Sequence, residues 1–520
     1  MLPRGQLSVG RKILLITTDQ MRYDALGCNG GVVARTPVLD GLARAGINYR
    51  RAHNQNVVCM PARATIITGQ YVRSHGVWMN GVSLPEETPT IAHWLKQHGY
   101  HTALFGKAHF EPWLGSPDEF YENRMAALGE TGPSRGFDHM ELANHFFEGH
   151  SHYDLWMRTQ HPEARANFYP MVTATGRQNR GGGGDTGAIQ VWHNDMPKEL
   201  YHTHWVAQRA IDWLQTLPAD ADWFVWLSFP DPHHPWDPPA SELGRVPWRD
   251  VPLPELYPKN STAAERWLDA KPKQWRGFYD GSLWSNLESP RDFRPADLTA
   301  DQVREINAMN HIENELIDAA CGRVIDQLTA RGWLNDTDIL FTTDHGELQG
   351  DFGLLFKGPY HCDALMRLPM FWRPAPSAGV TPAEVSAPVG HVDLAQTFCK
   401  IVGISEPMWV QGKPLPVSDA EATAQRRERV LTEWDSEHGP TNIHLRTIYH
   451  ADGFLCTACE PGSLHDGSEG ELYDMNTDPK QLDNLWRDPA RQQLRKDLLA
   501  DLYDSLPPAR TPRLPRRAPV

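Results

Sequence analysis

The chain has 520 residues, of which 40% are hydrophobic and 22% are charged, and its formal net charge is −15. These values are typical of a globular protein with more than one core, so we expect a large domain and a smaller one. The acidic balance argues against nucleic acid as a partner. A site for an anionic substrate would therefore need a local cluster of Lys, Arg, His or metal.

The sequence contains no apolar run of about 18 residues, so we expect no membrane-spanning helix and no membrane partner. Its first ten residues lack the apolar stretch of a secretory signal. The seven cysteines do not have the spacing of a disulfide framework, and the pair Cys456 and Cys459 is interpreted as structural. Together these features predict a reduced, cytoplasmic protein.

Short apolar runs alternate with helical patterns along most of the chain, which indicates a parallel α/β sheet. Strands are expected at residues 13–18, 102–105, 223–229 and 338–343. Helices are expected at residues 36–46, 88–96, 201–217 and 301–331. The first two begin with a Thr-Pro pair, in which Thr36 or Thr88 is the N-cap. We therefore predict an α/β fold in which a large, mainly parallel β-sheet is sandwiched by helices.

Two segments between these elements are expected to lack regular structure. The glycines at 181–184 have no nucleotide-binding pattern around them and are interpreted as a flexible loop. Residues 240–300, rich in Pro, Trp and charge, are interpreted as an insertion over the carboxyl ends of the strands.

The pattern changes near residue 425 to short strands, Gly-rich turns and a final helix at 491–506. We expect a main α/β domain over residues 1–425. A C-terminal α+β subdomain with a small antiparallel sheet is expected over residues 426–520. The Pro/Arg tail from Pro507 is interpreted as an arm that packs on a neighbouring copy, in a homo-oligomer such as a dimer.

Two of the predicted strands are followed directly by polar side chains. Asp19 and Gln20 follow the first strand, and Asp344 and His345 follow the strand at 338–343. Ligands of open α/β sheets bind beyond the carboxyl ends of the strands, so both pairs can meet there. Two carboxylates, an amide oxygen and an imidazole form a mostly hard site for a divalent cation. Either pair alone could equally be a turn or a helix cap.

A cysteine motif points to the chemistry of the site. Cys59-Met-Pro61-Ala-Arg63 is followed by a short apolar stretch that ends in Thr-Gly. This resembles the signature of the type I sulfatases of the alkaline phosphatase superfamily. The resemblance implies that a separate formylglycine-generating enzyme oxidises Cys59 to formylglycine, whose hydrated aldehyde carries two hydroxyls. One is a nucleophile and the other allows the covalent ester to collapse. A plain buried cysteine is the alternative.

The resemblance extends over nearly the whole chain. Gly-Lys107-Ala-His109 resembles the Gly-Lys-x-His of sulfatases, which supplies a cation and an imidazole to the reacting group. Pro-His233-His-Pro resembles Pro-His-x-Pro, which makes His233 the leaving-group residue. Phe-Lys357-Gly resembles the second anion-binding lysine, and Asn80 falls where phosphonate hydrolases and choline sulfatases carry a substrate-contacting Asn.

Some positions depart from the common sulfatase pattern. Gln20 stands where many sulfatases have a second Asp, and His345 stands where many have Asn; both departures occur in the phosphonate monoester hydrolase branch. That branch carries Tyr and Thr where this chain has Lys107 and His109, which favours a sulfatase. The neutral Gln and His weaken the case for calcium, so one calcium or manganese ion is expected and zinc stays open.

The resemblance implies a role for each residue. The metal would be held by Asp19, Gln20, residue 59, Asp344 and His345. Arg63 would orient the nucleophile, and Lys107 and Lys357 would neutralise the ester oxygens. His233 would protonate the leaving group, and His109 would take the proton from the second hydroxyl.

The implied function is hydrolysis of small-molecule sulfate monoesters, as in an arylsulfatase, with promiscuity towards phosphonate monoesters and phosphodiesters. Two alternatives stay open at this point. One is a phosphonate monoester hydrolase or phosphodiesterase of the same superfamily. The other is a non-catalytic sulfatase-like binding protein in which Cys59 is unmodified.

Overall fold

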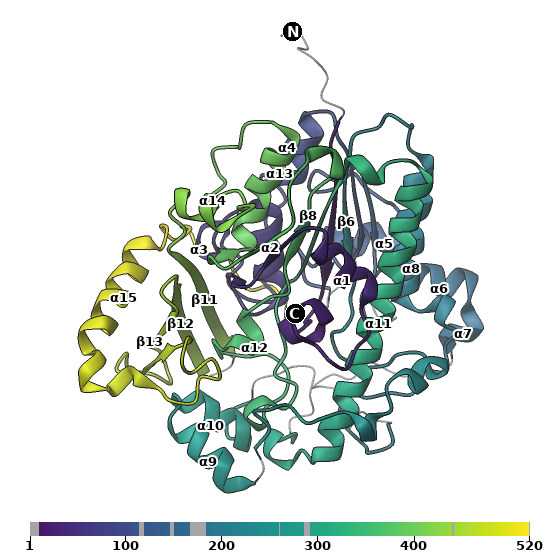
Figure 1. The fold of residues 1–520 in the computed structure, drawn as a ribbon. Helices are drawn as coiled ribbons and strands as arrows, with labels where there is room; N and C mark the ends of the chain where they lie inside the picture. The colour runs from purple at the N-terminus through teal and green to yellow at the C-terminus, as the bar shows by residue number, and fades with distance from the viewer. Residues whose placement is uncertain are drawn as a thin grey trace.

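The computed structural model describes residues 10–113, 119–145, 150–166, 184–258, 260–284, 292–438 and 441–518. Within these residues an eight-stranded sheet has the order β5-β4-β6-β1-β7-β8-β2-β9 (Figure 1). Its strands are β1 (Lys12–Thr18), β2 (Ile47–Tyr49), β4 (His101–Gly106), β5 (His139–Leu142), β6 (Trp223–Ser228), β7 (Thr337–Thr343), β8 (Phe371–Arg373) and β9 (Ala383–Val385). Only β8 runs antiparallel to its neighbours. The prediction of a large, mainly parallel sheet is confirmed.

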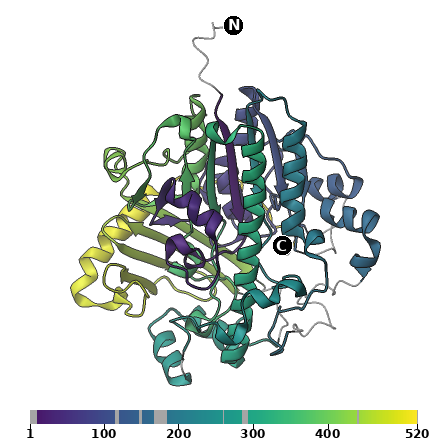
Figure 2. The ribbon, with the colours of Figure 1, turned by 45° about the vertical axis from the view of Figure 1, so that its right-hand side comes forward.

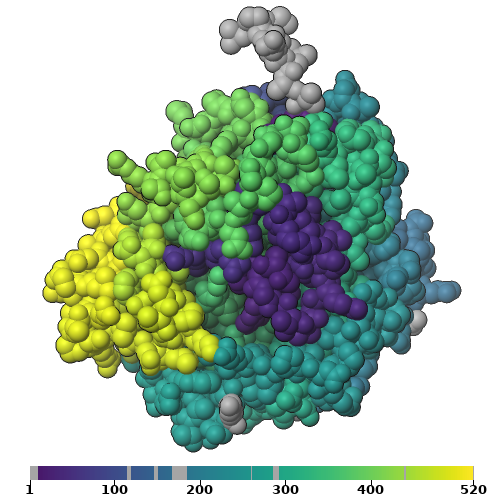
Figure 3. Space-filling view, in the orientation of Figure 1, coloured from purple at the N-terminus to yellow at the C-terminus, as the bar shows by residue number. Residues whose placement is uncertain are grey.

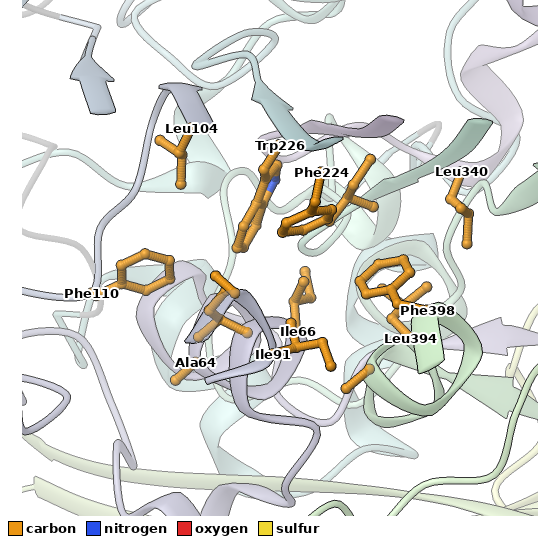
Figure 4. Close-up of a cluster of buried hydrophobic side chains, with 14 of the residues drawn as sticks. Ala64, Ile66, Ile91, Leu104, Phe110, Phe224, Trp226, Leu340, Leu394 and Phe398 are labelled. Atoms are coloured by element: carbon orange, nitrogen blue, oxygen red, sulfur yellow. The ribbon is translucent and has the colours of Figure 1, made fainter. Parts of the chain in front are cut away.

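Helices cover both faces of this sheet because successive residues of β1 point to opposite sides. Leu14 and Ile16 belong to the core under one set of helices, which comprises α1 (Pro37–Arg44), α8 (His202–Thr216) and α11 (Ala300–Ala330). Ile13 and Leu15 belong to the core under the other set, which comprises α2 (Cys59–Thr68), α4 (Ile91–Gln97) and α13 (Leu394–Val402). Figure 2 shows α8 and α11 side by side along the sheet, and Figure 4 shows the second core between β6, α2 and α13.

The predicted strands and long helices lie where the sequence placed them, but two helix starts differ in detail. α4 begins at Ile91, and its N-cap is Thr90, whose hydroxyl accepts a hydrogen bond from the His93 N–H at 3.2 Å. Thr88 instead lies in a turn, where its N–H donates to the Pro85 carbonyl. Thr36 precedes α1 as expected, but its hydroxyl donates to the Asp40 carboxylate at 3.2 Å. The Thr36 side chain makes no capping hydrogen bond to the helix backbone.

Residues 240–300 are more regular than predicted, since they contain α9 (Ser261–Asp269) and α10 (Lys273–Asp280). Lys271, between the two helices, is buried against the C-terminal strands. Its Nζ lies 2.8 Å from the Tyr473 hydroxyl and 3.4 Å from the Glu471 carboxylate. The segment that contains α9 and α10 therefore connects the main domain to the C-terminal sheet through Lys271. The glycines at 181–183 lie outside the described residues.

The C-terminal part contains a four-stranded antiparallel sheet, as predicted, in the order β11-β12-β13-β14. Its elements are β11 (Arg429–His438), β12 (Thr441–His450), β13 (Phe454–Glu460), β14 (Gly470–Asp474) and the helix α15 (Gln492–Ser505). Figure 3 shows these residues, in yellow and yellow-green, gathered at one side of the molecule. The domain boundary between residues 425 and 426 stays a prediction.

The tail after α15 contacts its own chain, and its packing on a neighbouring copy stays a prediction. The Arg510 N–H donates to the Arg73 carbonyl at 2.7 Å. Oligomeric state stays a prediction. None of the helices in the described ranges has the length and apolar character needed to cross a membrane.

We expect Lys271→Met to lower the free energy of unfolding by about 3 kcal/mol, because removing one partner of a buried ion pair leaves the other charge uncompensated. Lys273→Met is the matched control, since Lys273 pairs with Glu469 but its side chain is 57% exposed. Exposed pairs contribute about 1 kcal/mol or less. Urea unfolding of both variants measures the difference. Equal losses of unfolding free energy would show that the Lys271–Glu471 pair does not stabilise the contact with the C-terminal sheet.

Candidate active site

Four potential metal ligands converge where β1 and β7 end. The register pairs Thr18 with Thr343, so the next residues, Asp19 and Asp344, emerge side by side. With Cys59 and His345 they form a buried group whose ligand atoms all lie within 4.8 Å of one another. The Cys59 Sγ lies 3.2 Å from His345 Nε2 and 3.6 Å from Asp19 Oδ1.

In Asp19 and in Asp344, one carboxylate oxygen contacts cationic side chains and the other faces the centre of the site. Arg63 bonds Oδ2 of Asp344 at 2.9 Å and Oδ2 of Asp19 at 3.3 Å. Lys107 Nζ also lies 2.5 Å from Asp19 Oδ2. The Oδ1 atoms of both aspartates lie 3.8 Å from His345 Nε2. Burial by itself raises the pKa of Asp19, but the charges of Lys107 and Arg63 outweigh it and hold that pKa well below its usual value.

The donor set fits a divalent cation. His345 Nδ1 lies 2.9 Å from the Gly346 carbonyl, so this nitrogen carries the proton and the Nε2 lone pair faces the carboxylates. Gln20 lies next to this group, and its backbone N–H donates to Asp344 Oδ1 at 3.1 Å. Gln20 has a φ of 69°, a left-handed conformation that is costly for a residue other than glycine. Ionised carboxylate, neutral imidazole and amide oxygen are ligands of hard and borderline metals.

Two contacts orient the Gln20 side chain. Its Nε2 contacts the Glu347 carboxylate and lies 3.2 Å from His234 Nδ1. Burial raises the pKa of Glu347 to about 7. Its Oε1 accepts the Gln349 and Phe356 N–H groups, and its Oε2 accepts from the Gln20 amide nitrogen. The Gln20 Oε1 is thereby turned towards a cation, the Nζ of Lys357, at 2.7 Å.

Helix α2 carries Cys59 at its first position and Arg63 one turn later, so both side chains leave the same face of the helix. Burial and the neighbouring Asp19 raise the pKa of Cys59 to about 12. The encoded thiol is therefore protonated at neutral pH, and it is a poor nucleophile in this position.

Strand β4 ends at Gly106 and delivers Lys107 and His109. Gly106 has a φ of 103°, and a Cβ there would lie 1.8 Å from the Ser228 carbonyl oxygen, so only glycine fits. Neither ring nitrogen of the buried His109 has a hydrogen-bond partner within the described part of the chain. Burial, together with Lys107 and Arg63, holds the pKa of His109 well below its usual value. The neutral ring can therefore accept a proton from a ligand.

His233 and Lys357 form a second pair at the site. His233 Nε2 lies 2.8 Å from Lys357 Nζ, and its Nδ1 donates to the His234 carbonyl at 2.5 Å. Burial and the Lys357 charge hold the pKa of His233 well below its usual value. The imidazole is therefore neutral, and it accepts a hydrogen bond from the ammonium of Lys357.

Sequence reasoning missed His145, which follows β5. Its Nε2 lies 3.2 Å from Lys107 Nζ, and its ring stacks on His233 with centroids 4.2 Å apart. No motif marked His145, and β5 itself was not predicted. Only the pairing of β5 with β4 brings it to the site.

The predicted residue Asn80 and two side chains near it in the sequence, Arg73 and His75, bind other parts of the fold. Asn80 Oδ1 accepts a hydrogen bond from the Met60 N–H at 3.0 Å, so its side chain binds the first turn of α2. Arg73 pairs with Glu433 at 2.9 Å, and His75 bonds Thr65 at 3.1 Å. The contacts of Arg73 and His75 are structural, since each joins two side chains of the fold.

Comparisons with known proteins show the family of the chain. A family model described as Sulfatase matches residues 11–404, and one described as N-sulphoglucosamine sulphohydrolase, C-terminal, matches residues 350–506. An uncharacterized sulfatase, YidJ of Escherichia coli (strain K12), is 28% identical and covers 96% of this chain and 88% of its own. An arylsulfatase of Clostridium perfringens is 27% identical, with 94% of each chain covered.

Among solved structures, the phosphonate monoester hydrolase SpPMH from Silicibacter pomeroyi superposes with a TM-score of 0.75 at 23% identity. The alignment covers 98% of this chain and 100% of that one. This likeness supports the alkaline phosphatase-like fold. Because the Sulfatase model matches well over half of the sequence, the chain belongs to the sulfatase family.

Proposed function

We propose that the protein hydrolyses sulfate monoesters, with aryl sulfates among its substrates, through a formylglycine formed from Cys59. Family membership supports a hydrolase that acts on sulfate esters. The observation that carries the finer proposal is the position of Cys59. Its Sγ lies 3.2 Å from His345 Nε2 on one side and 3.9 Å from Lys107 Nζ on the other. A nucleophile here would attack between the metal ligands and a cation.

Two groups beyond the encoded side chains belong to this proposal. A divalent ion, calcium or manganese with zinc as a third candidate, would be held by Asp19, Gln20, residue 59, Asp344 and His345 and would supply Lewis acidity. Formylglycine at position 59 would supply a nucleophilic hydroxyl and a second hydroxyl for product release. A formylglycine-generating enzyme is the maturation partner.

The chain's own residues neutralise charge and move protons. Arg63, bonded to both aspartates, holds the first turn of α2 against the strand ends. Lys107 and Lys357 place ammonium groups on two sides of the site, and preorganised charges of this kind usually contribute most to catalysis. The Lys357–His233 pair holds a transferable proton for the leaving oxygen. His109, neutral and with both ring nitrogens unengaged within the described residues, would accept the proton from residue 59.

The alternative is a phosphonate monoester hydrolase or phosphodiesterase, supported by Gln20 and His345 in the metal group. Rates on an aryl sulfate and on a phosphonate monoester with the same leaving group test the two. We expect the sulfate ester to be the better substrate, with measurable phosphonatase activity. A preference for the phosphonate of more than about tenfold, which is about 1.4 kcal/mol in the barrier, would favour the alternative.

A paired variant sharpens this comparison. Lys107→Tyr with His109→Thr should lower sulfatase activity more than phosphonatase activity, because two basic groups beside the reacting group are lost. Equal losses on both substrates would mean that these two residues do not set the preference.

We expect Cys59→Ala to abolish turnover while metal binding and thermal stability stay close to those of the parent. Only one of about five metal ligands is lost, whereas the nucleophile is removed. Cys59→Ser should give a burst and then a stall, because serine offers one hydroxyl. Cys28→Ala, a half-buried cysteine, is the control. Activity of Cys59→Ala within tenfold of the parent, or a peptide mass showing an unmodified thiol in the active protein, would sink the mechanism.

We expect His233→Ala to slow poor leaving groups more than good ones, because general acid catalysis contributes about 10²–10⁴-fold when charge develops on the departing oxygen. His234→Ala is the matched control, since its ring stacks on His233 with centroids 4.0 Å apart but contacts Gln20. Its effect should be uniform across leaving groups. Rates of both variants on alkyl and nitrophenyl sulfates test this prediction. Equal rate losses of His233→Ala on the two esters would show that His233 does not assist departure of the leaving group.

We expect Glu347→Gln to weaken metal affinity by about 10–100-fold, as outer-shell changes do at metal sites. The isosteric amide keeps one acceptor oxygen for the Gln349 and Phe356 N–H groups, which share Oε1 of Glu347, and presents a donor to the Gln20 amide nitrogen, which needs an acceptor. Calorimetric titration of the metal-free protein with Mn²⁺ and with Ca²⁺ measures the effect. Glu315→Gln, a buried carboxylate that pairs with Arg35, is the control. Unchanged affinity would exclude Glu347 from orienting Gln20.

A further inference from the structure

The tail after α15 forms a second layer over the segment that carries Asn80. We call residues 507–518 the C-terminal strap. The strap touches residues 73–81 at both ends: the Arg510 N–H donates to the Arg73 carbonyl at 2.7 Å, and the Arg517 N–H donates to the Gly81 carbonyl at 2.7 Å. Between these points the Trp78 indole N–H donates to the Leu514 carbonyl at 2.9 Å.

Apolar and cationic side chains of the strap fill the space between these bonds. Leu514 packs against the core under α2 and α4. The Arg513 guanidinium lies 3.9 Å from the centroid of the Trp78 ring, a cation–π contact. The same Arg513 pairs with Glu437 of β11. The strap is therefore anchored both on the main sheet's helices and on the C-terminal sheet.

The strap makes its closest approach beside Asn80. The Arg516 Nε donates to the Asn80 carbonyl at 3.2 Å, and the Arg517 and Ala518 N–H groups both donate to the Gly81 carbonyl. Gly81 has a φ of 90°, and a Cβ there would lie 1.9 Å from the Ala518 carbonyl oxygen. Glycine thus permits the contact. Among the described residues, these two loop carbonyls accept hydrogen bonds from the strap alone.

The same loop also contacts Met60, the residue after Cys59. The Asn80 side chain accepts the Met60 N–H at 3.0 Å, and the Gly81 N–H contacts the Met60 sulfur at 3.1 Å. Met60 follows Cys59 directly, so the loop lies between the strap and the first turn of α2. A movement of this loop would therefore displace the backbone of Met60, next to residue 59.

We propose that the C-terminal strap is a positioning element of the active site, which holds Asn80 and the first turn of α2 in place from within the same chain. This inference rests on the proposed function insofar as Asn80 contacts the substrate. The strap replaces water on the carbonyls of residues 80 and 81, so the loop enters the substrate complex already ordered. Ordering before binding lowers KM, because less conformational entropy is lost when the ester binds.

The test compares the full chain with a chain that ends at residue 506. Hydrogen exchange of the amides of residues 60, 81 and 82 should speed up by about tenfold or more in the truncated chain, while β1 and β7 keep their protection. KM for an aryl sulfate should rise by about tenfold with a smaller change in kcat. A chain lacking only residues 519–520 is the control. Unchanged exchange and unchanged KM would overturn the proposal.

A point variant covers the case in which truncation unfolds the protein. Arg516→Met removes the donor to the Asn80 carbonyl and keeps the backbone bonds of the strap. Arg517→Met is its neighbour control, because the Arg517 guanidinium lies near the Phe120 ring, 5.6 Å from its centroid. Faster exchange in Arg516→Met but not in Arg517→Met supports the strap, and equal behaviour contradicts it.

Two further outcomes are separable. If neither chain turns over any sulfate or phosphonate ester, the proposed function fails, while the exchange data still decide the role of the strap. If a truncated chain regains activity when mixed with full-length Cys59→Ala protein, the strap acts between copies, and the assignment to a single chain is wrong.

Discussion

The arrangement of this active site depends on one buried guanidinium. Asp19 and Asp344 emerge from adjacent parallel strands and would repel each other in a site without water. Arg63 bonds both of them, and its other nitrogen donates to the Lys107 carbonyl at 2.6 Å and the Ser228 hydroxyl at 2.8 Å. Four strand ends are thereby tied to α2. Since Cys59 lies one turn before Arg63, the position of the nucleophile follows from the same bonds.

The charge of the site runs against that of the whole chain. The net charge is −15, yet Arg63, Lys107 and Lys357 are buried around Asp19 and Asp344. The imidazoles between the lysines stay neutral, because burial and the adjacent ammonium groups depress the pKa values of His109, His145 and His233. An anion that enters this site meets cations at fixed positions and neutral rings that can take up or pass on protons.

Much of the fold and of the candidate site could be predicted because the signals are local. A strand that is buried on both faces appears in the sequence as an apolar run, and a polar residue directly after such a run is a candidate metal ligand. Asp19 and Asp344 were predicted in this way. The limits are equally physical. α9 and α10 are amphipathic and short, and they lie in a segment whose prolines and tryptophans obscured their period. Thr88 and Thr90 both fit the pattern of an N-cap residue for α4. Thr90 is the N-cap in the structure, because Thr88 lies in the turn that its N–H closes on the Pro85 carbonyl.

The sequence by itself determined the order of the strands and helices along the chain and the chemical groups that follow each strand, since these depend on residues close together in the chain. The tertiary structure alone decided which groups meet. His145 reaches Lys107 because β5 pairs with β4, and Glu347 orients Gln20 across a gap of more than 300 positions in the chain. The C-terminal strap ends beside Asn80 for the same reason. Such contacts join distant segments through packing and hydrogen bonding, and no local pattern of residue types encodes them.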